Sequence, residues 1–179
     1  MKEYLSECFL ADYSSGQLIW KTRPLHHFQD VRAQKILNAR HAGRIAGTPG
    51  KDGYVRVLLG RKSYLIHRII WTLAHGNIPN DMHIDHINHD RADNSLGNLR
   101  IVSRKENLKN KSRSSRNTTG YSGITFRPDD GKYMVRISVN GKRYSAGCFS
   151  SLEDAVSVRN MELSKNNYHP NHGRNKNEI

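Results

Sequence analysis

The sequence has few cysteines, no long apolar run and a shortage of acidic residues. Cys8 and Cys148 lie far apart and form no CxxC pair, which argues against a disulfide framework and against a thiolate zinc site. No apolar stretch approaches the ~18 residues that a membrane-spanning helix needs. The N-terminus also lacks the charged-then-apolar start of a secretory signal. We therefore expect a protein of a reducing cytoplasm without a membrane partner.

The shortage of acidic residues leaves a large positive charge. Lys and Arg number 29 against 16 Asp and Glu, a formal net charge of +13 on 179 residues. Apolar residues make up 36% of the chain, which is enough for modest cores and unlike a wholly disordered chain. A small basic protein of this kind favours a polyanionic partner, most often nucleic acid.

A basic stretch without apolar residues divides the chain. Residues 109–119 cannot enter a core and are typical of a linker. We predict domains at residues 1–108 and 120–167, followed by a polar tail at 168–179. The stretch carries Lys109, Lys111, Arg113 and Arg116. It is either a solvated tether or an arm that lies along a DNA groove or backbone.

The first domain begins with a β-rich region. Residues 1–20 are expected to form short strands and residues 21–44 a polar loop. Strand-like residues on both sides of Gly60 predict a hairpin. Apolar residues spaced three to four apart then predict a helix that begins near Ile66 and ends at Gly76.

The second domain shows three strands and a helix. The strands are expected at residues 123–127, 133–139 and 143–149, and Asn140-Gly141 is a strong hairpin signal between the last two. Ser151 is expected to cap the helix. From Lys109 to Phe149 nine basic residues stand against two acidic ones, which favours a nucleic-acid contact face.

The segment richest in candidate catalytic and metal-binding residues runs from His83 to Asn107. Its order predicts a strand that ends at Asp85-His86, a polar loop, a strand at Leu99–Val102 and a helix after Ser103. Such a unit buries little by itself, and its many oxygen donors favour a divalent cation.

Two other interpretations compete with that of a divalent-cation site. An isolated Asp-His pair in a loop is usually a solvated turn. The histidines at 83, 86 and 89 also invite a zinc interpretation, but positions three apart on an extended chain do not converge as helical i, i+4 pairs do.

The segment resembles the HNH nucleases, specifically the phage and intron homing endonucleases with a ββα-metal fold. The resemblance covers roughly residues 40–110. It includes the hairpin, His67-Arg68 before an apolar helix, Asp85-His86, Asp93-Asn94, Asn98-Leu99-Arg100 and Glu106-Asn107. It implies Mg²⁺, or another divalent cation such as Mn²⁺, held by Asp85 and Asn107. It further implies that His86 is the general base and that the Asn98 oxygen holds the His86 ring.

These residue types suit phosphodiester hydrolysis. A hard cation with oxygen ligands neutralises charge on the phosphate and on the leaving oxygen. A histidine titrates near neutral pH and can take the proton of the attacking water. For His67 and Arg68, a structural hydrogen bond and a contact with a DNA phosphate are equally open.

The second domain resembles the AP2 DNA-binding domain, through Gly123-Ile124, Lys132-Tyr133, Gly141-Lys142, Gly147-Cys148-Phe149 and Glu153-Asp154-Ala155. The resemblance implies a three-stranded antiparallel sheet plus one helix. Strand alternation places a polar face on the side away from the helix, and its candidate DNA contacts are Arg127, Arg136, Ser138, Arg143 and Ser145. No Trp stands on these strands, so base preferences do not transfer. The alternative is an ordinary surface with exposed arginines.

Together these features predict an α+β protein that is a metal-dependent, site-directed DNA endonuclease of the HNH homing type. Its partner would be double-stranded DNA, bound by a monomer or a dimer, in a bacterial host cytoplasm if a phage encodes it. The competing class is a DNA-binding protein or regulator that keeps a degenerate HNH fold without cleaving. An RNA-binding module lacks support, because no aromatic stacking platform is apparent on the polar sheet face.

Overall fold

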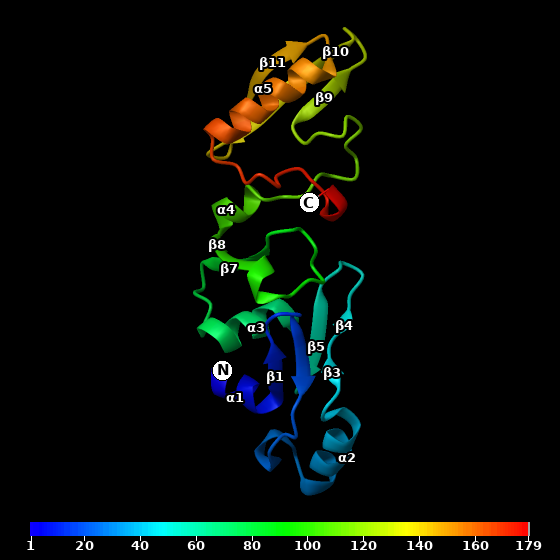
Figure 1. The fold of residues 1–179 in the computed structure, drawn as a ribbon, viewed down its shortest axis with the longest axis vertical. Coiled ribbons are helices and arrows are strands. Elements are labelled where there is room, and N and C mark those ends of the chain that lie inside the picture. Colours follow the sequence, from blue (N-terminus) through cyan, green and yellow to red (C-terminus); the bar gives the residue numbers. More distant parts are fainter. Residues whose placement is uncertain (179) are drawn as a thin grey trace. The chain divides into compact units, whose positions relative to one another are not determined.

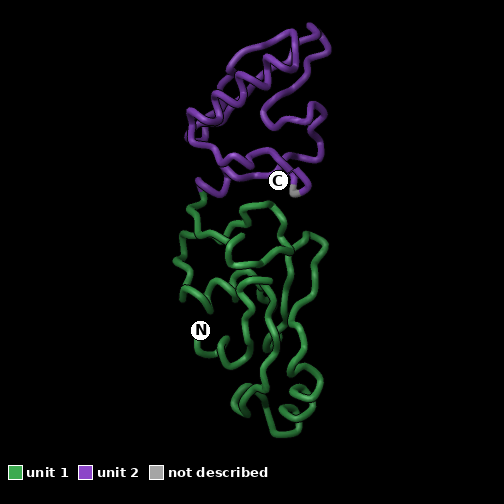
Figure 2. The backbone as a smooth tube through the Cα atoms, viewed as in Figure 1, with its two compact units in different colours: residues 1–104 green, residues 105–179 purple. Residues whose placement is uncertain are grey.

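The computed structural model describes residues 1–178, which form two compact units (Figures 1 and 2). Unit 1 covers Met1–Arg104, and unit 2 covers the chain from Lys105 onward. This division lies inside the range 1–108 expected for the first domain, so the short helix α4 (Arg104–Leu108) spans the boundary. Each unit is described by itself. Within the described residues, no helix combines the length and apolarity needed to cross a membrane.

Unit 1 combines short antiparallel sheets with three α-helices. Its elements in chain order are α1 (Lys2–Cys8), β1 (Phe9–Asp12), β2 (Gln17–Trp20), η1 (Leu25–His27), α2 (Val31–His41), β3 (Ile45–Ala46), β4 (Thr48–Pro49), β5 (Val55–Leu59), β6 (Lys62–Leu65), α3 (Ile66–His75), β7 (Met82–His86), η2 (Leu96–Asn98) and β8 (Leu99–Ser103). The strands pair in the orders β1-β2-β3, β4-β5-β6 and β7-β8.

Two predicted elements of unit 1 are confirmed. Strands β5 and β6 pair through a two-residue turn at Gly60-Arg61, both with positive φ, as a tight hairpin requires. Helix α3 buries Ile66, Ile69, Ile70 and Leu73 on one face and ends at Gly76 with φ 92°. This face joins the core of unit 1.

Two expectations for the N-terminal third are wrong. Residues Lys2–Cys8 form helix α1 rather than strand, because Leu5 and Cys8 bury one helical face. The expected loop at 21–44 contains helix α2, which Asp30 caps by accepting a hydrogen bond from Ala33 N at 2.7 Å. Helix α2 buries no residue, so it lacks the apolar periodicity by which a sequence reveals a helix.

Unit 2 contains a three-stranded antiparallel sheet and one long helix. Its strands β9 (Ile124–Arg127), β10 (Lys132–Val139) and β11 (Lys142–Phe149) pair in the order β11-β10-β9, and α5 (Leu152–Lys165) and η3 (Lys176–Glu178) follow. The Asn140-Gly141 turn joins β10 to β11, as predicted. Ser151 caps α5 by accepting from Asp154 N at 3.0 Å.

One face of this sheet forms a small core with α5. Its buried apolar residues are Ile124, Val135, Ile137, Ala155 and Leu163. The guanidinium of Arg159 is buried beside them and donates to Ser122 O and His172 O, both at 3.0 Å.

The stretch expected to be a linker packs against the C-terminal residues of unit 2. His169 N donates to Lys109 O at 3.3 Å, and Gly173 N donates to Lys111 O at 2.9 Å. Arg113 forms an ion pair with Glu178 at 2.5 Å. Backbone hydrogen bonds and an ion pair therefore hold residues 109–113 in place. A freely solvated tether would have neither kind of contact.

Candidate active site and basic groove

The predicted strand–loop–strand–helix order is present in the structure, and it places Asp85 and His86 at the end of strand β7. This strand pairs with β8 so that Asp85 lies opposite Arg100, and His86 lies opposite Leu99. Alternation along the strand buries Ile84 and His86 on one side and turns Asp85 to the other. Neighbouring residues thus deliver a carboxylate and an imidazole to one strand end.

The side chain of Asp85 is held by its cross-strand partner. Arg100 donates to Asp85 Oδ2 from Nε at 3.0 Å and from Nη2 at 2.8 Å, and both side chains are largely shielded from solvent. The ion pair keeps the carboxylate in place. A divalent ion would have to use the second carboxylate oxygen or displace Arg100.

Asn98 holds the loop after β7. Its Oδ1 accepts from Asn88 N at 3.0 Å, and its Nδ2 donates to Asp93 O at 2.8 Å. The side chain therefore ties the start of the loop to its middle. This differs from the expectation that the Asn98 oxygen holds the His86 ring, because that oxygen is directed at the backbone.

Asn94 contacts the His86 ring instead. His86 Nε2 lies 3.3 Å from Asn94 Oδ1, while Asn94 Nδ2 donates to Ala92 O at 3.0 Å. The second bond fixes the amide orientation, so Oδ1 faces the ring and His86 Nε2–H is the donor. In this tautomer Nδ1 is the unprotonated ring nitrogen.

The turn between β1 and β2 contacts the loop that carries Asn94. Leu96 N donates to Tyr13 O at 2.9 Å. Gly16, with φ 70°, lies so close that an added Cβ would stand 2.2 Å from the carbonyl carbon of Asn94. Only glycine fits there, and the contact holds Asn94 beside His86.

Aromatic rings surround the buried face of His86. The ring of His67, from the first turn of α3, meets it edge-on at 4.9 Å between centroids, and Tyr54 lies 5.9 Å away. His67 is 4% exposed, and its Nδ1 has no hydrogen-bond partner among the described residues. His67 was a candidate for phosphate contact, but in this structure it is buried, whereas its neighbour Arg68 is exposed.

Burial controls the protonation of both rings. It lowers the pKa of His86 below its ordinary value, and the hydrogen bond from the ring to Asn94 opposes this shift in part. Burial, followed by the nearby His86 and Arg68, lowers the pKa of His67 to about 3. Both imidazoles are therefore neutral at pH 7, as a general base must be before it accepts a proton.

His83 lies on the other side of strand β7 from His86. His83 is exposed on β7, whereas His86 is buried on the same strand. Residues three apart on a strand face opposite sides, so the zinc interpretation of this spacing has no support in the fold. Asn107, the expected second metal ligand, lies on α4 within unit 2, and its role stays a prediction.

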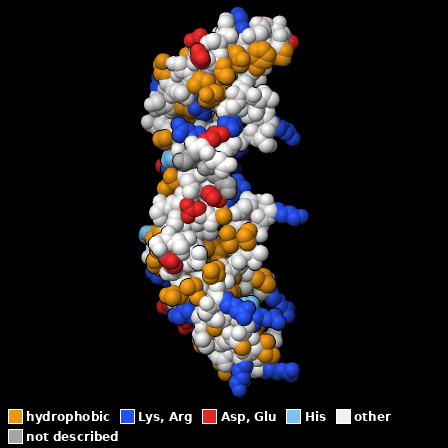
Figure 3. All heavy atoms as spheres, turned by 45° about the vertical axis from the view of Figure 1, so that its right-hand side comes forward, with side chains coloured by type: hydrophobic (Ala, Val, Ile, Leu, Met, Phe, Trp, Pro, Cys, Tyr) orange, Lys and Arg blue, Asp and Glu red, His pale blue; other side chains and the backbone are white. Residues whose placement is uncertain are grey.

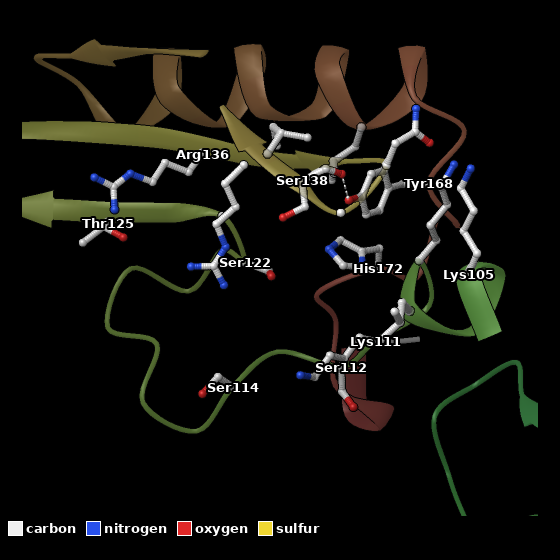
Figure 4. A pocket seen from close by; sticks show the side chains of 18 residues that line it. Lys105, Lys111, Ser112, Ser114, Ser122, Thr125, Arg136, Ser138, Tyr168 and His172 are labelled. Carbon is white, nitrogen blue, oxygen red and sulfur yellow. Dashed lines mark hydrogen bonds between the residues drawn. The ribbon is translucent and has the colours of Figure 1, made fainter. Parts of the chain in front are cut away.

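Unit 2 carries a basic groove between its sheet and the segment that follows α4 (Figure 4). Its volume is about 990 Å³. Strand residues line one wall, the segment that follows α4 lines a second, and Tyr168 and His172 of the C-terminal segment lie at one end. The basic residues of its lining are Lys105, Lys109, Lys111, Arg136 and Arg143.

The structure brings together some of the expected DNA contacts and separates others. Five of them line the groove: Lys109, Lys111, Arg136, Ser138 and Arg143. Ser145 lies opposite Arg136 in the strand register. Arg127 pairs with Asp130 at 3.4 Å, and Arg113 with Glu178. Arg116 is exposed beyond the groove-lining segment.

Sequence reasoning missed several residues of these two sites. Asn94 and Asn98 are the same residue type four positions apart in an irregular loop, and no spacing rule distinguishes them. Tyr168 and His172 come from residues expected to form a polar tail. On the face drawn in Figure 3, Lys and Arg side chains project from both units, so exposed charge alone does not mark the groove.

Comparison with known proteins identifies the segment around His86. Residues 64–109 match the family model described as HNH endonuclease. We call these residues the HNH segment, after the family model that they match. It contains His67, Asp85, His86 and Asn98, and also Asn107. The groove of unit 2 lies almost entirely outside it.

Two curated relatives extend the similarity. An uncharacterized HNH endonuclease, L560, of Acanthamoeba polyphaga mimivirus is 34% identical over 114 residues, which is 63% of this chain and 57% of the relative. Protein 3.8 of Escherichia phage T7 is 30% identical over 79 residues, which is 44% of this chain and 65% of that protein. The chain thus spans less than two thirds of either relative.

One solved structure, described as DNA binding and cleavage by the HNH homing endonuclease I-HmuI, aligns with a TM-score of 0.39 and 19% identity over 88% of this chain and 80% of that one. A similarity of this size does not establish a shared fold.

Proposed function

We propose that this protein is a divalent-metal-dependent DNA endonuclease in which His86 activates the attacking water. The observation that carries the proposal is the environment of His86. Its ring is buried, neutral and held by Asn94 with the proton on Nε2, and the residue before it in the chain, Asp85, supplies a carboxylate on the other side of the same strand end. A general base needs a fixed ring that is unprotonated at neutral pH.

The proposed reaction is hydrolysis of one phosphodiester bond. His86 Nδ1 takes a proton from water, the water oxygen bonds to phosphorus, and the bond from phosphorus to the 3′ oxygen breaks. The leaving 3′ oxygen takes a proton from solvent, and His86 later returns its proton to solvent. The products carry a 5′-phosphate and a 3′-hydroxyl. The oxygen donors of Asp85 and Asn107 suit a hard cation such as Mg²⁺ or Mn²⁺. When bound, such an ion neutralises charge on the phosphate and on the leaving oxygen.

The groove of unit 2 supplies a DNA contact in this proposal. Lys109, Lys111, Arg136 and Arg143 place positive charge around it, and Ser138 adds a hydroxyl. Such side chains bind phosphate oxygens and position a duplex without reading its sequence. This part would give binding its strong salt dependence. An AP2-like reading of base edges by Arg136 and Arg143 is the more specific form of the proposal.

One observation favours a second candidate, a DNA-binding protein that does not cleave. Arg100 already neutralises Asp85, the carboxylate that would hold the metal. A cationic side chain at that position weakens the attraction for a second cation. Under this alternative the groove of unit 2 binds DNA, and the HNH segment contributes shape alone.

Plasmid cleavage separates the two candidates. Supercoiled plasmids that carry a library of phage genomic fragments are incubated with the wild type, with H86A and with H75A, in Mg²⁺ or in EDTA. We expect metal-dependent nicking or linearisation that H86A reduces by about 10²–10⁴-fold. H75A is the matched control, since His75 is exposed at the end of α3 and stacks on Trp71.

DNA binding is measured on the same three proteins. Binding by H86A that equals that of the wild type, with cleavage lost, supports the nuclease. Salt-sensitive binding without cleavage by any of the three proteins supports the DNA-binding alternative. Cleavage that persists in H86A contradicts the assignment of His86 as the base.

A further inference from the structure

A second cluster of metal-type donors lies in unit 1, apart from the HNH segment. Glu7 comes from helix α1, and His26 and His27 come from the 3₁₀ turn η1, some twenty residues later. One oxygen of Glu7, Oε2, lies 3.0 Å from His26 Nε2 and 2.6 Å from His27 Nε2. The ligand atoms of the three residues all lie within 4.8 Å of one another.

These donors are the types that bind divalent transition metals. Two imidazole nitrogens and one carboxylate oxygen form a common zinc ligand set, with a fourth position open to water. Ligand atoms in a tetrahedral zinc site are about 3.3 Å apart, given metal–ligand bonds of about 2.0–2.2 Å. An ion would therefore lengthen the contact between Glu7 Oε2 and His27 Nε2, which is now 2.6 Å, by less than about 1 Å.

The more buried of the two rings is already positioned by its neighbours. The His27 side chain is fully buried, and its ring lies 4.4 Å from that of Tyr4. Its Nδ1 lies 3.5 Å from Cys8 Sγ. Metal-binding histidines commonly have their second ring nitrogen held by a neighbouring group, which directs Nε2 at the metal.

The other two ligands face solvent. The side chain of His26 is 66% exposed, and that of Glu7 is 43% exposed. An ion can therefore enter from outside, and water can complete its coordination.

We propose that Glu7, His26 and His27 bind one divalent transition-metal ion of the zinc type, which fastens η1 to α1. The ion would replace the protons that now lie between the rings and the carboxylate. This site is separate from the oxygen ligands proposed for the nuclease metal, and it stands whether or not the protein cleaves DNA. Its role is to fasten the segment between β2 and α2, which contains η1, to helix α1.

The test uses the full-length protein with Cys148→Ser as background, because Cys148 is an exposed thiol that could bind zinc by itself. After chelation and desalting, the protein is titrated with Zn²⁺ against a zinc indicator. Bound metal is counted by atomic emission. The variants are E7Q and H26A, both at exposed side chains, with H75A as the histidine-matched control. D85N reports on any zinc at the proposed nuclease site.

We expect one Zn²⁺ per chain in the background protein, in H75A and in D85N. E7Q and H26A should each weaken binding by more than about tenfold. X-ray absorption of the zinc-loaded protein should show nitrogen and oxygen ligands, two of them imidazole, without sulfur. Zn²⁺ should raise the unfolding midpoint of the background protein more than that of H26A.

Equal zinc binding by E7Q, H26A and the background protein would overturn the proposal. A sulfur ligand in the absorption spectrum would also overturn it, since that would move the ion to Cys8. Failure of the background protein to bind zinc would leave Glu7 as a hydrogen-bond acceptor for two histidines and end the metal assignment. Circular dichroism of both variants verifies that a loss of binding is not a loss of fold.

Discussion

The two units hold their polar groups in opposite ways. Unit 1 builds a large apolar core around residues such as Leu18 and Ile70, and it buries His67, His86, Asn94 and Asn98 at the edge of that core. Unit 2 has a smaller core, and its Lys and Arg side chains line an open groove. Burial changes the proton affinity of a histidine, whereas an open groove leaves basic side chains charged. The first arrangement suits chemistry and the second suits binding.

The smaller core of unit 2 is supplemented by polar contacts. The buried Arg159 guanidinium joins α5 to Ser122 and His172, and the ion pair of Arg113 with Glu178 holds another part of the C-terminal segment. Such contacts require every buried donor to find an acceptor. We therefore expect unit 2 to depend more on its terminal residues than unit 1 does.

The largest expected effect is a loss of stability in one unit when a residue of its core is truncated. Ile70 is fully buried in unit 1, so Ile70→Ala should lower the free energy of unfolding of that unit by about 2–5 kcal/mol. In calorimetry the transition of unit 2 should stay in place. Ile36→Ala, at an exposed residue of α2, should cost less than about 0.5 kcal/mol. If Ile70→Ala lowered the unfolding temperatures of both transitions, the units would not be independent.

The groove of unit 2 should govern affinity without governing chemistry. Replacing both Arg136 and Arg143 by Ala should lower DNA affinity and reduce the slope of log K against log salt by about 2, near 0.9 for each lost phosphate contact. Cleavage at saturating protein should remain. The matched double variant replaces Arg61 and Lys62 in the hairpin turn of unit 1. An equal loss of slope in that control would assign the effect to net charge rather than to the groove.

Burial of His67 should make unit 1 sensitive to acid. Its pKa is about 3 in the folded protein and 6.5 as a free side chain, so below pH 6.5 the unfolded state binds a proton that the folded state excludes. Stability should therefore fall by about 2 kcal/mol between pH 7 and pH 5 from this group alone. His86, whose pKa is also lowered, adds to the same trend. Denaturant unfolding should show a flatter pH dependence in H67Q, and an unchanged dependence would contradict the burial argument.

The smallest expected effect concerns the pH profile of cleavage. Because burial lowers the pKa of His86, the acid limb of the rate profile should lie below the ordinary histidine pKa of 6.5. Asn94 raises that pKa in part, so N94A should move the limb further toward acid. N94A should also slow cleavage at pH 7, since the ring loses its support. Movement of the limb toward alkaline pH would assign it to another group.

Local patterns were sufficient to predict much of the fold. Features that depend on neighbours within a few residues are all present. They are the Gly60-Arg61 and Asn140-Gly141 turns, the apolar face of α3 and the strand–loop–strand–helix order. Helices α1 and α2 escaped prediction, because the first is short and the second buries no residue to mark its period.

The sequence alone was sufficient to place Asp85 and His86 together at a strand end, since they are neighbours in the chain. Only the tertiary structure selected Asn94 as the partner of His86, set His67 against its ring and brought Glu7 to His26 and His27. It likewise joined residues 109–111 to the C-terminal segment. These contacts depend on how separate elements pack, and packing arises from the whole core rather than from the spacing of residues along the chain.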